Sequence, residues 1–177
     1  DGLSLKDWVL EENRLKNNSG QAYVAFVKNK KTGEQGVFRF LKTSKLLVTE
    51  RGEEIKRFYR ELEILKKINH PNIVKILDHT KNNERQWYIS KKGEDFTKYW
   101  TKFCTDNNKE AIFKKSIDIL QKLSDALSVL HTEKVTHLDI KFNNIVINEN
   151  EDPVLIDFGI SFVSDEENIL NTPVCNL

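Results

Sequence analysis

The 177-residue sequence has no methionine, only two cysteines and three prolines, and seven glycines. So little proline and glycine excludes a collagen-like fibre or a low-complexity chain. The cysteines, Cys104 and Cys175, lack the spacing of a zinc site or a disulfide framework, so we expect reduced thiols in an intracellular protein. The lack of methionine in a chain that begins at Asp1 predicts a trimmed piece of a longer protein.

Neither sign of charge is in excess. Lys and Arg number 28 against 27 Asp and Glu, a net charge of +1, which predicts neither a nucleic acid nor a membrane as partner. No apolar run approaches the roughly 20 residues of a membrane-spanning helix, and the N-terminus has no signal-peptide pattern. A cytoplasmic location is therefore expected. A hydrophobic content of 38% is enough for one well-filled domain.

Residues able to do chemistry gather in His-Leu-Asp-Ile-Lys-Phe-Asn-Asn at 137–144 and in Leu-Ile-Asp-Phe-Gly at 155–159. Between them, two β-rich runs joined by the polar turn 148–153 predict a hairpin. That hairpin would bring Asn144 and Asp157 together. Amide and carboxylate oxygens that converge from two strand ends suit Mg²⁺.

The pattern His-x-Asp-x-Lys-x-x-Asn followed by Asp-Phe-Gly resembles the catalytic loop and metal motif of eukaryotic-like (Hanks-type) serine/threonine protein kinases. The resemblance implies that Asp139 is the catalytic base and that Asn144 and Asp157 hold Mg²⁺. Lys141 would place a cation on the transferring phosphate, and a lysine here is typical of serine/threonine rather than tyrosine kinases.

The resemblance also implies roles for His137 and Leu138. His137 would be structural, packed under Phe158. Leu138 takes the place of the arginine that normally binds a phosphate on the activation loop, so such phosphorylation is not expected to be the switch.

Residues 17–24 fall where kinases carry a glycine-rich phosphate loop, with Val24 at the valine position. Ser19 and Gly20 would form its turn. The match is degenerate, because small side chains stand where glycines normally let backbone amides approach phosphate. An ordinary hairpin loop is the alternative.

The β-rich runs 23–27 and 36–41 predict a second hairpin, whose later strand should carry the cation for the α- and β-phosphates. An ungapped alignment puts Arg39 there and Val37 above the adenine. A shift of three residues puts Lys42 there instead. The choice matters, because a guanidinium is broader and more rigid than an ammonium group.

Apolar residues at helical spacing predict a helix over 53–68 with Glu61 on its inner side. Glu61 is therefore the candidate for an ion pair with the strand cation. The next segment, Asn-His-Pro-Asn-Ile-Val-Lys-Ile at 69–76, resembles the kinase segment that leads into the fourth strand. Residues 86–90 would form the fifth strand, and 91–94 the hinge beside adenine.

Two helices are predicted next, over 96–103 and 110–132. The longer has apolar residues at helical intervals, which predict a core helix of about six turns: Phe113, Ile117, Leu120, Leu123, Leu127 and Leu130.

We therefore predict an α+β, bilobal protein-kinase-like fold that binds ATP and Mg²⁺ between its lobes. Residues 1–89 would form the small β-sheet lobe with one helix, and 90–177 the hinge and the first part of a mainly helical lobe. The resemblance ends in the activation loop, so the rest of that lobe is expected from a longer chain.

The expected reaction is transfer of the ATP γ-phosphate to a serine or threonine hydroxyl of a protein substrate. One alternative is a pseudokinase that serves as a nucleotide-binding scaffold or regulator, which Arg39, the degenerate phosphate loop and Leu138 favour. A second alternative is a small-molecule phosphotransferase of the aminoglycoside type, against which Lys141 and the segment 69–76 argue.

Overall fold

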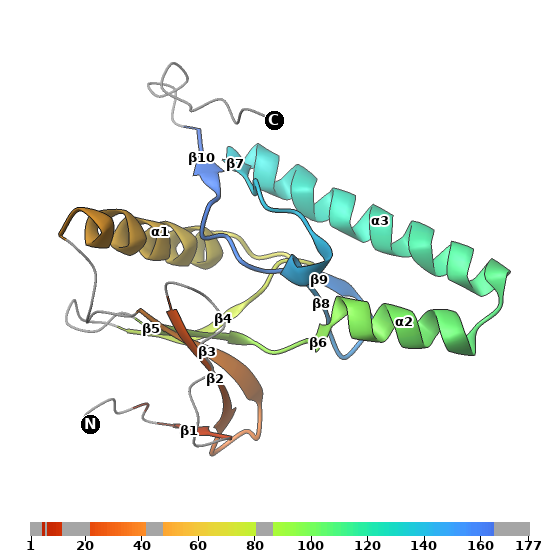
Figure 1. Cartoon of the computed structure of the whole chain (residues 1–177), viewed down its shortest axis with the longest axis horizontal. Coiled ribbons are helices and arrows are strands. Elements are labelled where there is room, and N and C mark those ends of the chain that lie inside the picture. The colour runs from red at the N-terminus through yellow and green to blue at the C-terminus, as the bar shows by residue number, and fades with distance from the viewer. Residues whose placement is uncertain (1–4, 6, 12–21, 42–47, 81–86, 165–177) are drawn as a thin grey trace.

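The computed structural model describes residues 5, 7–11, 22–41, 48–80 and 87–164. The first half forms a five-stranded antiparallel sheet in the order β1-β2-β3-β5-β4, with one helix beside it (Figure 1). Its elements are β1 (Trp8–Leu10), β2 (Ala22–Asn29), β3 (Gln35–Leu41), α1 (Val48–Lys67), β4 (Ile76–His79) and β5 (Trp87–Lys91).

The β2–β3 hairpin confirms the prediction from the two β-rich runs. The side chain of Asn29 closes its turn by accepting hydrogen bonds from the backbone N–H groups of Lys31 (2.9 Å) and Thr32 (3.1 Å). Gly33 then takes a φ of 75°, which a residue with a β-carbon rarely adopts.

The second half is mainly helical and carries two short sheets. Its elements are β6 (Glu94–Asp95), α2 (Phe96–Asp106), α3 (Lys109–Thr132), β7 (Val135–Thr136), the 3-10 turn Phe142–Asn144, β8 (Ile145–Ile147), β9 (Pro153–Leu155) and β10 (Phe162–Val163). Both helices begin at a side-chain cap: Asp95 accepts from the Lys98 N–H at 2.8 Å, and Asn108 from the Ala111 N–H at 2.9 Å. The β8–β9 hairpin is the one predicted before Asp157.

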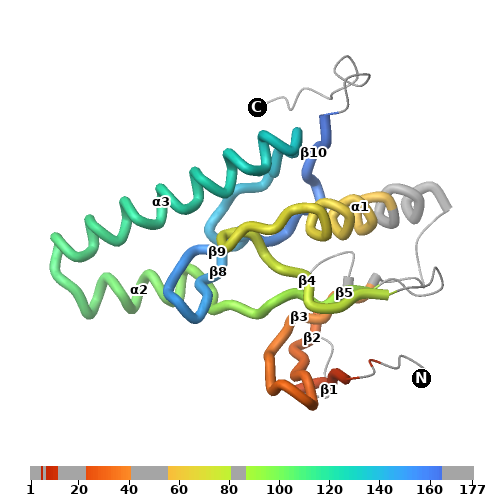
Figure 2. The backbone as a smooth tube through the Cα atoms, turned by 180° about the vertical axis from the view of Figure 1, so that it is seen from behind, coloured from red at the N-terminus to blue at the C-terminus, as the bar shows by residue number. Residues whose placement is uncertain are grey.

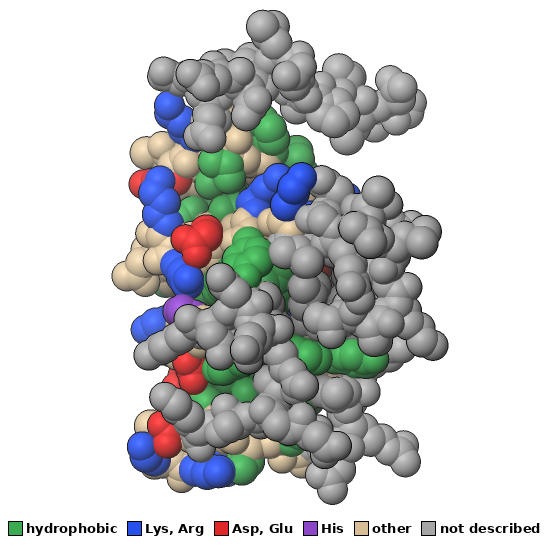
Figure 3. All heavy atoms as spheres, turned by 90° about the vertical axis from the view of Figure 1, so that its left-hand side faces the viewer, with side chains coloured by type: hydrophobic (Ala, Val, Ile, Leu, Met, Phe, Trp, Pro, Cys, Tyr) green, Lys and Arg blue, Asp and Glu red, His purple; other side chains and the backbone are tan. Residues whose placement is uncertain are grey.

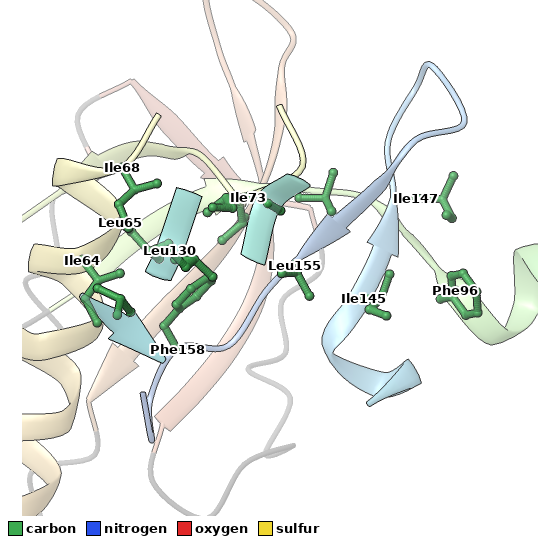
Figure 4. Close-up of a cluster of buried hydrophobic side chains, with 14 of the residues drawn as sticks. Ile64, Leu65, Ile68, Ile73, Phe96, Leu130, Ile145, Ile147, Leu155 and Phe158 are labelled. Carbon is green, nitrogen blue, oxygen red and sulfur yellow. The ribbon is translucent and has the colours of Figure 1, made fainter. Parts of the chain in front are cut away.

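The largest hydrophobic cluster joins the two halves. Ile64, Leu65 and Ile68 of α1 pack with Leu130 of α3 and with Phe158 (Figure 4). Figures 1 and 2 show α1 between the five-stranded sheet and the β7–β10 pair. The helix is thereby held against residues 155–159, which carry the second motif, Leu-Ile-Asp-Phe-Gly. The lobe boundary after residue 89 stays a prediction, and this cluster crosses it.

The expectation that α3 is a core helix along its whole length was wrong. Phe113, Ile117 and Leu120 are 68%, 40% and 62% exposed, whereas Ala126 and Leu130, near the other end, are fully buried. Apolar spacing indicates which side of a helix is hydrophobic, but it does not indicate whether another element covers that side.

The surface agrees with the balanced composition. On the coloured part of the face in Figure 3, basic and acidic side chains are interspersed with hydrophobic ones. None of the helices in the described ranges is both long enough and apolar enough to traverse a bilayer.

Candidate active site

Asp139 lies at the centre of the catalytic-loop segment, held by two neighbours. The Lys141 ammonium contacts its two carboxylate oxygens at 2.8 and 3.0 Å. The buried Asn144 amide donates to Asp139 Oδ2 at 2.8 Å and to its backbone oxygen at 2.9 Å. The hydrogen bond from Lys141, and then that from Asn144, lower the pKa of Asp139, while partial burial opposes them. The carboxylate is therefore ionised at neutral pH and can orient a hydroxyl.

His137 connects this loop to the second motif. Its Nδ1 accepts the Asp139 backbone N–H at 3.3 Å, so the ring proton belongs on Nε2, which lies 3.1 Å from the Ile156 carbonyl oxygen. Burial lowers the pKa of His137, which favours this neutral form. The ring also meets Phe158 edge to face at 4.6 Å. The predicted packing of His137 under Phe158 is confirmed.

The backbone is strained at both motifs. Leu138 and Asp157 each have a φ of 64°, in the left-handed region that residues with a β-carbon seldom occupy. Such strain persists only where surrounding contacts hold it, and it concentrates at functional sites. The hydrogen bonds of His137 supply such contacts on both sides.

Asn144 pairs with the residue that precedes Asp157 at the end of the β8–β9 hairpin, where the Ile156 N–H donates to the Asn144 carbonyl at 3.0 Å. The Asn144 amide nitrogen already bonds Asp139, so its side-chain oxygen is the atom suited to a metal. The Asp157 side chain is 41% exposed. Within the described ranges there is no cluster of three or more His, Cys, Asp or Glu side chains fit to hold a metal. One carboxylate and one amide oxygen fit Mg²⁺, which usually completes its shell with water and substrate phosphates.

Arg39 lies on β3, close to Asp157 and Glu61. Its Nη1 is 3.4 Å from Glu61 Oε1 and 3.6 Å from Asp157 Oδ1. The pairing predicted between Glu61 and a strand cation is thus confirmed with Arg39. The rival candidate Lys42 lies outside the described residues, as do Ser19 and Gly20. The same Glu61 oxygen accepts the Phe158 backbone N–H at 3.1 Å, which links α1 to the second motif.

Glu61 is the most deeply buried charged group of the site, with 6% of its side chain exposed. Burial raises its pKa, and the nearby guanidinium of Arg39 opposes that shift. The pKa of Arg39 is itself raised by Tyr88, Glu61 and Asp157, against the effect of burial. Tyr88, which was not among the residues predicted for the site, lies beside both partners and affects the pKa of each. Only the β3–β5 register, which pairs Arg39 with Tyr88, could have revealed it.

Val24 and Val37 share one face of the sheet with Arg39. Val24 lies opposite Arg39 on β2, and Val37 precedes Arg39 by two residues, so their side chains point the same way. Both valines are only partly buried. They offer an apolar surface next to the cation. A bound nucleotide would need such a surface for its base, close to the cation that would bind its phosphates. The sheet thus brings together three of the predicted nucleotide-contacting residues.

The segment after β5 passes unusually close to β8. A β-carbon on Gly93 would lie 2.6 Å from Val146 Cγ2 and 2.8 Å from the Ile147 carbonyl oxygen. Only glycine fits there without displacement of the strand. The predicted hinge segment is therefore held directly above the hairpin that carries Asn144.

A model of the protein kinase domain matches residues 18–176, so the chain belongs to the protein kinase family, in its Hanks-type serine/threonine group. The "Probable serine/threonine-protein kinase samkA" of Dictyostelium discoideum is 32% identical over 149 residues, 80% of this chain and 22% of that protein. "CBL-interacting serine/threonine-protein kinase 19" of Arabidopsis thaliana is 30% identical over 159 residues, 88% and 31% of the two chains. The chain therefore spans less than a third of the length of either relative.

Proposed function

We propose that the protein transfers the γ-phosphate of ATP to a serine or threonine hydroxyl of a protein substrate. The observation that carries the proposal is the convergence of the catalytic-loop residues and the β3 cation on one site. Asp139 has Lys141 and Asn144 as direct partners, and Asp157 faces Arg39, which in turn pairs with Glu61. A module without turnover has no need to retain this complete set.

In this proposal, the ionised Asp139 accepts the hydrogen bond of the attacking hydroxyl and takes its proton as the new P–O bond forms, while the bond from the γ-phosphorus to the bridging oxygen breaks and ADP leaves. Lys141, which pairs with Asp139, would place its charge on the transferred phosphoryl group. Arg39 binds the α- and β-phosphates and is held by Glu61. Mg²⁺ held by Asn144 and Asp157 would neutralise the phosphate oxygens. Catalysis then rests on positioning and on fixed charge.

The second candidate function is a nucleotide-binding scaffold without turnover. Arg39 favours it, because its guanidinium bridges Glu61 and Asp157 at 3.4 and 3.6 Å and so occupies a carboxylate proposed for the metal. ATP and Mg²⁺ would have to compete with that contact.

The test is incubation of the full-length protein with Mg²⁺ and γ-labelled ATP over an array of serine, threonine and tyrosine peptides and small alcohols. We expect label on serine or threonine. Label on small alcohols alone would identify a small-molecule phosphotransferase. Nucleotide binding without transfer to any acceptor would favour the scaffold.

A further inference from the structure

The guanidinium of Arg39 has more hydrogen-bonding capacity than its two carboxylate contacts use. Both contacts run through Nη1, at 3.4 Å to Glu61 and 3.6 Å to Asp157. A guanidinium carries five N–H donors, and strong charge-assisted bonds are typically about 2.7–2.9 Å long. Because 23% of the side chain is exposed, most of this group is shielded from water that could serve as an acceptor. A further partner inside the protein would therefore stabilise it.

Tyr88 is placed to be that partner. It lies directly opposite Arg39 in the β3–β5 pairing, so both side chains project from the same face of the sheet. Only 1% of Tyr88 is exposed, and its ring packs on Phe58 of α1 with 5.3 Å between ring centroids. A buried phenol hydroxyl needs a hydrogen-bond partner, and the polar groups beside Tyr88 are the guanidinium of Arg39 and the carboxylate of Glu61, whose pKa values it affects.

The chemistry of a hydroxyl suits this double contact. A phenol has one donor and two lone pairs, so the Tyr88 hydroxyl is able to accept a hydrogen bond from the guanidinium and to donate one to the carboxylate. Burial raises the pKa of Tyr88 well above its ordinary value of 10, which keeps the phenol neutral. A lysine ammonium is a compact point charge on a flexible stem, and it presents no second nitrogen for the phenol to engage.

We propose that Tyr88 is a positioning residue matched to Arg39, whose hydroxyl bridges the guanidinium and Glu61 and so lets an arginine take the place of the phosphate-binding lysine. The inference rests on the proposed role of Arg39 in nucleotide binding. It does not require phosphoryl transfer to occur.

The test is a double-mutant cycle on the full-length protein, with Tyr88→Phe made in the natural background and in an Arg39→Lys background. Tyr88→Phe keeps the ring and removes only the oxygen. With Arg39 present, loss of the bridge should weaken binding of Mg-ADP about tenfold. With lysine at position 39, the same change should alter the dissociation constant less than about threefold.

Tyr99→Phe is the matched control. The Tyr99 hydroxyl also contacts a carboxylate, Glu151 at 3.3 Å, but this hydrogen bond is exposed to solvent. We expect no change in Mg-ADP binding from this substitution. The melting temperatures of all variants give a second measure that needs no ligand.

A loss of affinity and of melting temperature confined to the Arg39 background supports the inference. Equal losses in both backgrounds would give Tyr88 a purely structural role and overturn it, as would no loss in either. Failure of the natural protein to bind Mg-ADP would also overturn it. If the cycle behaves as expected but no phosphate is transferred to any acceptor, the proposed function fails and the role of Tyr88 stands.

Discussion

The site contains two groups of charges that differ in their access to water. In the catalytic loop, Lys141 and Asp139 form a pair whose side chains are 53% and 29% exposed. In the inner group, the corresponding values are 23% for Arg39 and 6% for Glu61. The outer pair matches the kinase pattern residue by residue, whereas the inner pair contains the main departure from it. A buried charge must find all its partners inside the protein, so a change of cation there requires a change in its surroundings.

The largest effect is expected on the rate from the outer group. Asp139→Asn removes the acceptor for the hydroxyl proton and should lower the transfer rate about 10³-fold, while nucleotide binding is retained. Initial rates at saturating ATP measure it. Asp125→Asn makes the same chemical change at an exposed position of α3 and should have no effect. Similar rates for the two variants would remove Asp139 from the mechanism.

The inner group should dominate stability. Glu61→Ala leaves Arg39, the Phe158 N–H and the Tyr88 hydroxyl without their shared acceptor, and each unsatisfied buried group costs about 1–3 kcal/mol. We expect the free energy of unfolding to fall by about 3 kcal/mol in denaturant titrations. Glu63→Ala, two residues along α1 with its side chain 69% exposed, should change it by less than about 0.5 kcal/mol. Equal losses of unfolding free energy in the two variants would contradict the claim that burial makes Glu61 more important for stability than Glu63.

Lys141→Ala should lower the rate of phosphoryl transfer far more than it lowers the free energy of unfolding. Removal of an exposed pair should cost less than about 1 kcal/mol of stability, but about 10² in transfer rate. The pKa of Asp139 should rise, because the Lys141 hydrogen bond is the main cause of its depression. A carboxyl-carbon NMR titration measures this shift. Lys102→Ala on α2, also exposed, is the control and should leave all three quantities unchanged.

The lowered pKa of Asp139 also makes the stability of the folded protein depend on pH in acid. It contributes stability that is complete above the ordinary value of 3.8 and is lost as the pH falls through the lower pKa of the folded state. Lys141→Ala should shrink this contribution. An unchanged acid-unfolding curve in that variant would contradict the assigned cause.

The smallest effect concerns His137, which lies between the two groups. Because its pKa is lowered from 6.5, the folded ring stays neutral while the unfolded ring binds a proton. Stability should therefore fall as the pH drops below 6.5, by at most about 1.4 kcal/mol per unit, until the folded ring is protonated. Imidazole ¹⁵N NMR should find the Nε2–H tautomer and a midpoint below 6.5. A proton on Nδ1 would contradict the hydrogen bond from Asp139.

Much of the site could be predicted from local pattern. The β8–β9 hairpin, α1 and the β2–β3 hairpin follow from residue spacing, and they place Asn144, Asp157 and Glu61. The contact of Tyr88 with Arg39 could not be predicted, because it depends on the register of two strands far apart in sequence. The exposed half of α3 could not be predicted either, because spacing says nothing of what covers an apolar face.

The most direct test of the central claim is intact-mass spectrometry of the full-length protein and a generic serine/threonine substrate after incubation with Mg²⁺ and ATP carrying ¹⁸O in its γ-phosphate. We expect labelled phosphate on a protein hydroxyl, and none when Asp139→Asn replaces the natural protein. Nucleotide binding without any labelled product, or the same product with both proteins, would contradict it.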